Sequence, residues 1–421
     1  MSRSKKLTNE KRTGRSSLCC AALFLALNVV GVNAYAGAAE QAKRIHDRLT
    51  GVPPTLETLS EMTAILSDPA LGDAAGFEAA LHAIDLGDSD DFYNVTLKNW
   101  AAPWTNRDHD VFVPLNDYIA TAIGFVRDER DFRELLYADV LYTGRDGLSG
   151  VDAYSLSSNN HYVQLEAGLE RSSAQGISLK DDLIAVPQSS LTGLPPEAVA
   201  GVITSRAASK AFFIVGTNRA NFRFTLLNHM CVDLEQVHDT TRAADRIRQD
   251  ISRSPGGDSR LFLNSCIGCH SGQDPMAQAF AYHNYSFNAD GDPTGDNGQI
   301  EYTPGVVQPK YFNNDSNFPN GFITPNDDWA NYWRGGKNVN LGWDPTLPGR
   351  GAGAATMLQE MSHSTAYAQC HVARAFSTVC LREPQDAADR AEITSLLTDF
   401  TGNGYNLKRV FARSAAYCKG E

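Results

Sequence analysis

Beyond its N-terminal end, the sequence lacks long apolar runs. No segment after residue 36 reaches the ~18 consecutive apolar residues that a membrane-spanning helix needs. Basic residues are also scarce, because 37 Lys and Arg stand against 49 Asp and Glu and give a net charge of −12. An acidic surface repels nucleic acids and anionic lipids and attracts basic partners. These two shortages argue against a membrane span in the mature chain and against nucleic-acid binding.

Several catalytic signatures are missing as well. The sequence contains no P-loop and no convincing Ser-His-Asp arrangement. The glycine-rich stretch at 349–355 (GRGAGAA) does not follow a predicted strand, so it is a weak match to a dinucleotide-binding loop. The chain also shows no internal repeat and no low-complexity tract. A nucleotide-dependent enzyme or a triad hydrolase therefore has no support in the sequence.

The N-terminus has the order of an export signal. A basic head with six Lys and Arg residues precedes an apolar run from Leu18 to about Val32, and Ala34-Tyr35-Ala36 follows as a small-x-small cleavage site. We expect residues 1–36 to be a signal peptide, with cleavage after Ala36. The alternative is an uncleaved anchor helix, but the apolar run is short for a helix that spans a membrane. Cleavage of the signal peptide removes six basic residues and one acidic residue, so the net charge of the mature chain becomes −17. The expected location is the periplasm or the extracellular space.

Four of the eight cysteines suggest disulfide bonds: Cys231, Cys370, Cys380 and Cys418. Cys370 and Cys380 lie ten residues apart on one predicted helix, a rise of about 15 Å that is too long for a disulfide. One of them should therefore pair with Cys231 and the other with Cys418. The alternative of four buried free thiols is less typical of an oxidising compartment.

Apolar residues at helical spacing predict a mainly helical chain. Residues 145–195 and 287–350 lack this spacing, and the second stretch is about sixty residues rich in Gly, Pro, Asn, Asp, Trp and Tyr. A loop of that length is usually functional. The helical pattern returns from Ala354 to the end. Helices are predicted at 38–51, 55–66, 113–126, 132–144, 194–218 and 221–237.

The central signal is Cys-x-x-Cys-His at Cys266, Cys269 and His270. This spacing is typical of c-type haem attachment. One helical turn presents both sulfurs to the porphyrin vinyl groups, and the following histidine reaches the iron as proximal ligand. We expect the second ring nitrogen of His270 to donate to a carbonyl that fixes its tautomer. The alternatives are a redox dithiol and half of a zinc site, but no second pair of zinc ligands at similar spacing is present.

The segment from Cys266 to Tyr285 resembles the haem segment of exported cytochrome-bearing families of uncharacterised function. The departures from their pattern are Met276 and Ala277. The resemblance is strong over about twenty residues and weak elsewhere, and it implies haem and export but no substrate. The matching residues are Cys266, Cys269, His270, Asp274, Pro275, Ala279, Phe280, Asn284 and Tyr285.

The sequence does not identify the second axial ligand of the iron. A sixth ligand makes an electron-transfer haem, whereas an open position allows peroxide or small-gas chemistry. Met276 lies only six residues past His270, a tight path to the other haem face. Better candidates are Met361, Met357 and His363, although a methionine pair at helical spacing is more often core. Weaker candidates are His283, His229 and His161.

An acidic stretch at 290–301 has partial likeness to a calcium loop. Two features argue against a helix-loop-helix site: Asn297 stands at the usually aliphatic position, and the following Tyr-Thr-Pro-Gly cannot start a helix. An acidic, glycine-rich turn is the plainer interpretation. The candidate oxygen ligands are Asp290, Asp292, Thr294, Asp296 and Glu301.

These observations predict a mainly α protein with one covalent haem c. We expect a helical domain at 37–250, a cytochrome c-like haem domain at 251–383 with a long loop-rich wrap, and a C-terminal helical segment at 384–421. The favoured function is electron transfer to or from a redox partner protein with a basic surface. The alternatives are a haem c-dependent periplasmic oxidoreductase and a haem-based sensor or surface binding module. The oligomeric state is not set by the sequence.

Overall fold

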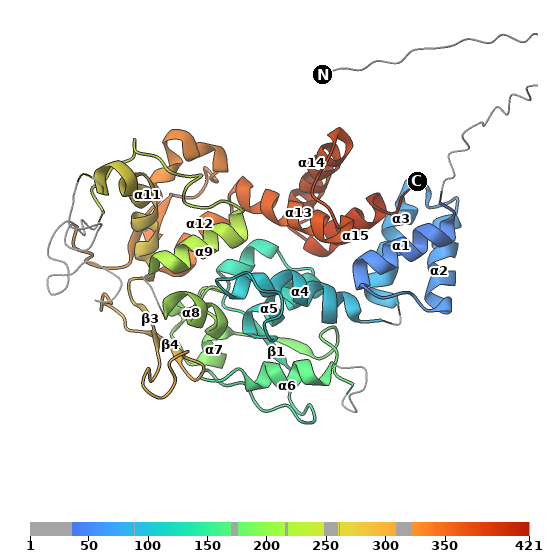
Figure 1. The fold of residues 1–421 in the computed structure, drawn as a ribbon, viewed down its shortest axis with the longest axis horizontal. Helices are drawn as coiled ribbons and strands as arrows, with labels where there is room; N and C mark the ends of the chain where they lie inside the picture. The colour runs from blue at the N-terminus through green and yellow to red at the C-terminus, as the bar shows by residue number, and fades with distance from the viewer. Residues whose placement is uncertain are drawn as a thin grey trace, which may run out of the picture. The chain divides into compact units, whose positions relative to one another are not determined.

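Helices dominate the computed structural model (Figure 1). It describes residues 36–87, 89–169, 176–214, 218–247, 260, 262–308 and 322–420. The predicted mainly α class is therefore confirmed. Nearly all of the predicted signal peptide and the predicted domain boundary near Ser252 lie outside the described residues. The described residues from Ala36 onward form one compact unit. The domain limits at 250 and 383 stay predictions.

Local capping explains where the first helices begin and end. Helix α1 (Ala38–Thr50) ends at Gly51, whose positive φ of 74° suits a residue without a side chain. Helix α2 (Leu56–Ser67) begins after Thr55, whose side chain accepts a hydrogen bond from the Thr58 amide. Both predicted helices are confirmed. The other helices of the first half are α3 (Ala75–Leu81), α4 (Lys98–Ala101), α5 (Asp117–Arg127), α6 (Asn160–Gly168), α7 (Gln188–Thr192), α8 (Arg206–Phe213) and α9 (Asn218–Met230).

The helices predicted at 132–144 and 194–218 are wrong in part. Residues Phe132–Leu136 form a 3₁₀ turn, and Leu141–Gly144 form strand β1. In the second segment the α-helix begins only at Arg206. The cause is backbone pairing with distant segments. The Gly201 amide donates to the Ala138 carbonyl at 3.1 Å, and the Val202 amide donates to the Leu135 carbonyl at 3.0 Å. Leu141–Gly144 pairs with Leu183–Val186. Backbone pairing between distant segments overrides local helical preference.

Three two-stranded antiparallel sheets interrupt the helices. Each pair is short, so the strands lie between helices and do not form a central sheet. The pairs are β1 (Leu141–Gly144) with β2 (Leu183–Val186), β3 (His283–Ser286) with β4 (Gln299–Tyr302), and β5 (Asp328–Ala330) with β6 (Arg350–Ala352).

The segment 287–350 is loop-rich in its described part, as predicted. It contains β4, β5 and two 3₁₀ turns at Tyr332–Arg334 and Gly336–Leu341. Strand β5 and the first of these turns pack against helix α11 (Ile267–Ala277). The wrap therefore contacts the helix that carries the Cys-x-x-Cys-His sequence.

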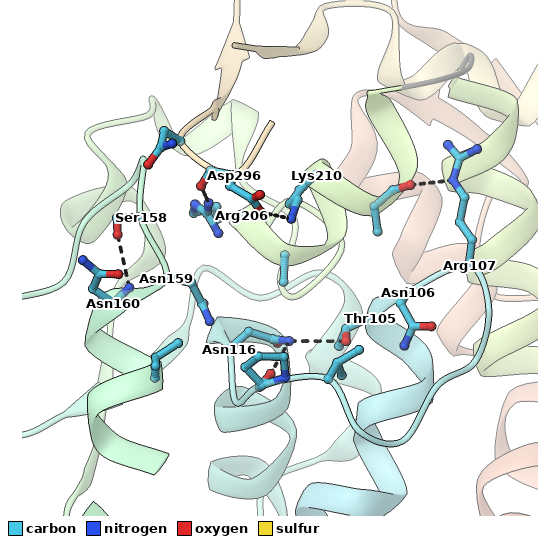
Figure 2. A pocket seen from close by; sticks show the side chains of 16 residues that line it. Thr105, Asn106, Arg107, Asn116, Ser158, Asn159, Asn160, Arg206, Lys210 and Asp296 are labelled. Atoms are coloured by element: carbon cyan, nitrogen blue, oxygen red, sulfur yellow. Dashed lines mark hydrogen bonds and ion pairs between the residues drawn. The ribbon is translucent and has the colours of Figure 1, made fainter. Parts of the chain in front are cut away.

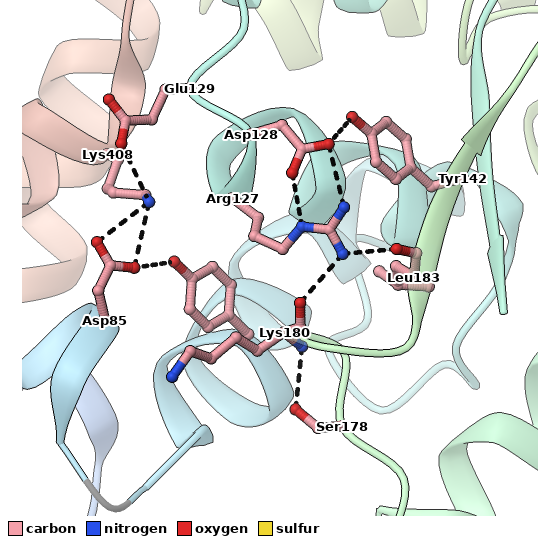
Figure 3. A network of polar contacts seen from close by, with 10 residues as sticks. Asp85, Arg127, Asp128, Glu129, Tyr142, Ser178, Lys180, Leu183 and Lys408 are labelled. Atoms are coloured by element: carbon pink, nitrogen blue, oxygen red, sulfur yellow. Dashed lines mark hydrogen bonds and ion pairs between the residues drawn. The ribbon is translucent and has the colours of Figure 1, made fainter. Parts of the chain in front are cut away.

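The C-terminal helices return to the N-terminal ones. Helix α15 packs on α1, α3 and α13, which places the two ends of the described chain in one part of the fold (Figure 1). Lys408 of α15 is buried, and its ammonium group lies 3.2 Å from the Asp85 carboxylate and 3.3 Å from that of Glu129 (Figure 3). The helices of this region are α12 (Ala354–Ser362), α13 (Thr365–Cys380), α14 (Ala387–Gly402) and α15 (Leu407–Tyr417).

Two cysteine pairs lie at disulfide distance. Cys231 pairs with Cys370, and Cys380 pairs with Cys418, with Cα–Cα distances of 5.3 and 5.5 Å. The prediction that Cys370 and Cys380 share a helix and pair elsewhere is confirmed. Among the helices that the structure describes, none combines the length and the apolar character required to cross a bilayer.

Candidate functional site

Helix α11 gathers the three residues of the Cys-x-x-Cys-His sequence on one face. Cys266 immediately precedes its first residue, and Cys269 and His270 follow three and four positions later. At 3.6 residues per turn, the three side chains fall within about 100° of one another around the axis. All three are partly exposed, whereas Gly268 between them is buried. The two thiols and the imidazole therefore share an accessible surface of the helix.

The opposite face of α11 is packed closely because two glycines lie there. A Cβ on Gly268 would lie 2.3 Å from Nε2 of His238, and one on Gly272 would lie 1.9 Å from Nε1 of Trp333. The Asp239 amide donates to the Gly268 carbonyl at 2.8 Å. Trp333 packs here on the face away from the cysteines. These contacts on the glycine side of α11 therefore fix the orientation of the opposite face, which carries the two cysteines and His270.

Cys266 and Cys269 are free thiols, although the other four described cysteines are paired. The Cys269 thiol donates to the Leu234 carbonyl at 3.4 Å, and burial raises the pKa of this thiol, with Cys266 adding to the effect. A redox dithiol needs a lowered thiol pKa, so the environment of Cys269 does not favour that chemistry. Two unbonded thiols on one turn followed by a histidine fit the donor set of thioether haem attachment.

His270 is held by a carboxylate and not by the carbonyl that the sequence suggested. Its Nδ1 lies 3.0 Å from Oδ1 of Asp274, one helical turn further on. Arg219 of α9 binds the same carboxylate with two hydrogen bonds of 2.7 and 2.6 Å. Burial alone would raise the pKa of Asp274, but Arg219 and His270 together hold it well below its usual range. An ionised Asp274 accepts the Nδ1 proton and so fixes the imidazole tautomer in which Nε2 carries the lone pair.

The favoured distal candidates lie in the core. Met357 and Met361 are fully buried on α12, which packs against the turn Phe132–Leu136 and against α9 and α13. His363 follows that helix, and its Nδ1 lies 2.9 Å from the Gln359 carbonyl. Met276 is fully buried on α11, about 120° around the axis from His270. Their role as axial ligands stays a prediction.

The three weaker histidine candidates are engaged in the core. Both ring nitrogens of His161 have partners, the Asp152 carbonyl at 2.6 Å and the Gly144 amide at 3.0 Å. His229 contacts a tyrosine hydroxyl and another histidine, and Nε2 of His283 lies 2.8 Å from a carbonyl. Iron binding by His161 or His229 would cost one of these bonds.

Three of the candidate calcium ligands lie together, because the Thr294 hydroxyl donates to the carboxylates of Asp292 and Asp296. Asp292 also accepts hydrogen bonds from two amides of its own loop at 2.9 and 2.6 Å, Asp296 forms an ion pair with Lys210, and Glu301 lies on β4 opposite Asn284. Within the described part of the chain, no three His, Cys, Asp or Glu side chains converge to hold a metal ion. Calcium binding stays a prediction.

Lys210 and Asp296 also line a cavity of about 590 Å³ (Figure 2). Its wall is rich in amide side chains, but these are occupied: Asn116 donates to Thr105, and Asn159 donates to the Leu115 carbonyl. Its cations also have protein partners, because Arg206 contacts the Asp296 carbonyl and Arg107 donates to the Ala211 carbonyl at 2.6 Å. Among the described residues of this wall, Nε of Arg206 is the buried polar atom that has no hydrogen-bond partner.

Comparison with known proteins gave a negative result. No family model, no curated protein and no solved structure matches the chain. The resemblance of Cys266–Tyr285 to exported cytochrome segments therefore stays an expectation.

Sequence reasoning missed Arg219 and Arg374. Arg219 lies 55 residues before Asp274 in the chain and reaches it only because α9 packs on α11. Arg374 lies on α13 beside a second cavity. Neither residue stands in a recognisable pattern, and no local signal could have identified them.

Proposed function

We propose that the chain is an exported monohaem c-type cytochrome that transfers electrons. Cys266 and Cys269 would anchor the porphyrin, and His270 would be the proximal iron ligand. The observation that carries the proposal is the shared, partly exposed face of α11 on which the two free thiols and the imidazole lie. When bound there, haem supplies a one-electron couple near the surface, where a partner protein can approach.

Two further features support export and partner choice. The Cys231–Cys370 and Cys380–Cys418 pairs are typical of an oxidising compartment. The excess of Asp and Glu over Lys and Arg favours a redox partner with a basic surface.

The chain itself contributes orientation and electronic tuning. Asp274 fixes the His270 tautomer, and Arg219 fixes Asp274. The close packing of Gly268 and Gly272 prevents rotation of α11. These residues would hold the imidazole in one position during oxidation and reduction, which keeps the cost of rearrangement low.

A haem c-dependent oxidoreductase is the second candidate. The carboxylate on Nδ1 favours it, because a hydrogen bond to an anion makes the imidazole a stronger electron donor to iron. The chain also has more residues than electron carriers of this type need.

Optical spectra of the exported protein, recorded with and without dithionite and with carbon monoxide, test the proposal. A sharp reduced spectrum of six-coordinate low-spin haem that does not change with carbon monoxide is expected for electron transfer. High-spin iron that binds carbon monoxide would favour the oxidoreductase. A protein that carries no haem after expression with a haem-attachment system would overturn both.

A further inference from the structure

A second cavity, of about 530 Å³, lies beside the end of α9 and the middle of α13. Trp100, Pro103 and Trp104 supply its apolar wall, and Asn228 and Arg374 supply polar groups. Its volume falls in the range of small-molecule sites, which combine an apolar wall with a few polar groups. None of these residues belongs to the Cys-x-x-Cys-His face of α11.

Arg374 is the unusual group in this wall. It is partly buried, and within the described residues its hydrogen bond is a 3.2 Å contact from the guanidinium to the Leu227 carbonyl. Among the described residues, no carboxylate forms an ion pair with it, and this includes Glu383, which also lines the cavity. A buried cation without an anion is costly, so such cations usually have a partner. Elsewhere in the fold, Arg219 and Arg334 each bind a buried carboxylate with two hydrogen bonds.

The residues behind Arg374 do not offset its charge. His229 and His371 are fully buried, with Nδ1 of the first 3.3 Å from Nε2 of the second, and the Tyr118 hydroxyl lies 2.5 Å from the other side of His229. Burial lowers the pKa of both histidines well below the usual value, and Arg374 lowers it further. The layer behind Trp100 and Trp104 is therefore neutral, aromatic and hydrogen-bonded, and it supplies no anion to Arg374.

The wall also contains unused hydrogen-bonding groups. Nε1 of Trp100, Oδ1 of Asn228 and Oγ of Ser377 are buried, and none of them has a hydrogen-bond partner in the part of the chain that the structure describes. Buried polar atoms without partners are rare in native proteins. All three belong to residues that line this one cavity.

We propose that this cavity binds a small organic carboxylate with an aromatic or apolar body. The carboxylate would pair with the guanidinium of Arg374, whose planar fork matches it. The body would lie against Trp100 and Trp104, the latter of which already contacts the guanidinium at 5.7 Å from its ring centroid. The site is separate from the face of α11, so its occupancy does not depend on the proposed haem.

Calorimetric titration of the purified full-length protein with benzoate and with benzamide tests the proposal. The two probes have nearly the same shape, but only benzoate carries a charge. Benzoate is expected to bind at least tenfold more tightly than benzamide. The R374Q variant should lose that difference, and R350Q, a change at an exposed arginine on β6, should retain it.

Because R374Q changes a buried site, its circular dichroism and Tm must match those of a folded protein before its result counts. The comparison of the two probes on the unmodified protein remains decisive if R374Q fails to fold. Equal affinity for benzoate and benzamide, no detectable heat with benzoate up to millimolar concentrations, or unchanged benzoate binding by a folded R374Q would each overturn the proposal.

Discussion

At the scale of single residues, Asp274 connects the proposed haem ligand to the rest of the fold. Its carboxylate is buried, contacts Nδ1 of His270 at 3.0 Å and binds Arg219 through both oxygens. A carbonyl in this position would fix the tautomer but carry no charge. The carboxylate adds negative charge, which favours the ferric over the ferrous state of a bound iron.

Replacing Asp274 by asparagine should raise the reduction potential of the haem-loaded protein. The amide oxygen still accepts the Nδ1 proton, but the negative charge is gone and the ferric state is less favoured. We expect an increase on the order of 60 mV, which corresponds to a tenfold change for one electron. Spectroelectrochemical titration measures it.

E360Q is the matched control, because Glu360 is another buried carboxylate held by an arginine, Arg334, at 2.7 Å. It should lower stability and leave the potential unchanged. A D274N potential equal to that of the unmodified protein would show that Asp274 only supports the structure.

His283 should make the stability of the fold depend on pH. Burial lowers its pKa to about 4, despite the contact to the Ala198 carbonyl that raises it, whereas an unfolded histidine has a pKa of about 6.5. Between these values the unfolded chain binds a proton that the folded chain does not, so stability falls as the pH decreases. From pH 7 to pH 5 this group alone should cost about 2 kcal/mol.

Urea denaturation at both pH values, for the unmodified protein and for H283Q, measures this contribution. The variant should show a smaller loss on acidification. F280L removes apolar contact beside His283 and should lower stability equally at both pH values. If H283Q and F280L respond alike to pH, the histidine does not titrate as inferred.

At the scale of elements, the orientation of α11 depends on its two buried glycines. In G272A, the new methyl group would meet the indole of Trp333, which is fully buried and has no room to move. Overpacking of this kind costs about 1–3 kcal/mol. Thermal and urea denaturation should show the loss.

G402A provides the comparison, because Gly402 also lies in a helix, α14, and has no atom within 4 Å of the position of a new Cβ. Its stability should be unchanged or slightly higher. Equal stability of the two variants would mean that Trp333 does not pack against α11.

The disulfide between Cys380 and Cys418 joins the end of α13 to the residue after α15. Its removal in the C380S/C418S variant releases a constraint over a sequence separation of 38 residues. We expect a loss of about 2–4 kcal/mol in the free energy of unfolding. Peptide mapping under non-reducing conditions provides the control; a map that joins Cys231 to Cys418 would contradict this pairing.

Elements with local signals could be predicted from the sequence, whereas elements set by distant contacts could not. Thr55 and Gly51 carry their capping roles in their own chemistry, and the helices that they bound are where we expected them. Part of the helix predicted at 132–144 and at 194–205 does not form, because residues 135 and 138 bond to 202 and 201, and β1 pairs with β2. The same rule holds in the site: the positions of Cys266 and His270 follow from spacing, but the Arg219–Asp274 pair depends on how α9 packs on α11.

At the scale of the whole molecule, helix α9 contributes one residue to each of the two candidate sites. Arg219 in its first turn serves the His270 side, and Asn228 in its last turn lines the cavity beside Arg374. Nine residues of helix separate them by about 14 Å. One helix thus positions a residue of each site, although the two sites are separate.

The mass of the peptide that carries Cys266 and Cys269 tests the central claim most directly. After export in a host with a haem-attachment system and digestion, we expect this peptide to be heavier by one haem, and the C266S/C269S variant to yield only the bare peptide and a colourless protein. A bare peptide mass from the unmodified protein, or a variant that keeps its red colour and its iron, would contradict covalent haem attachment on α11.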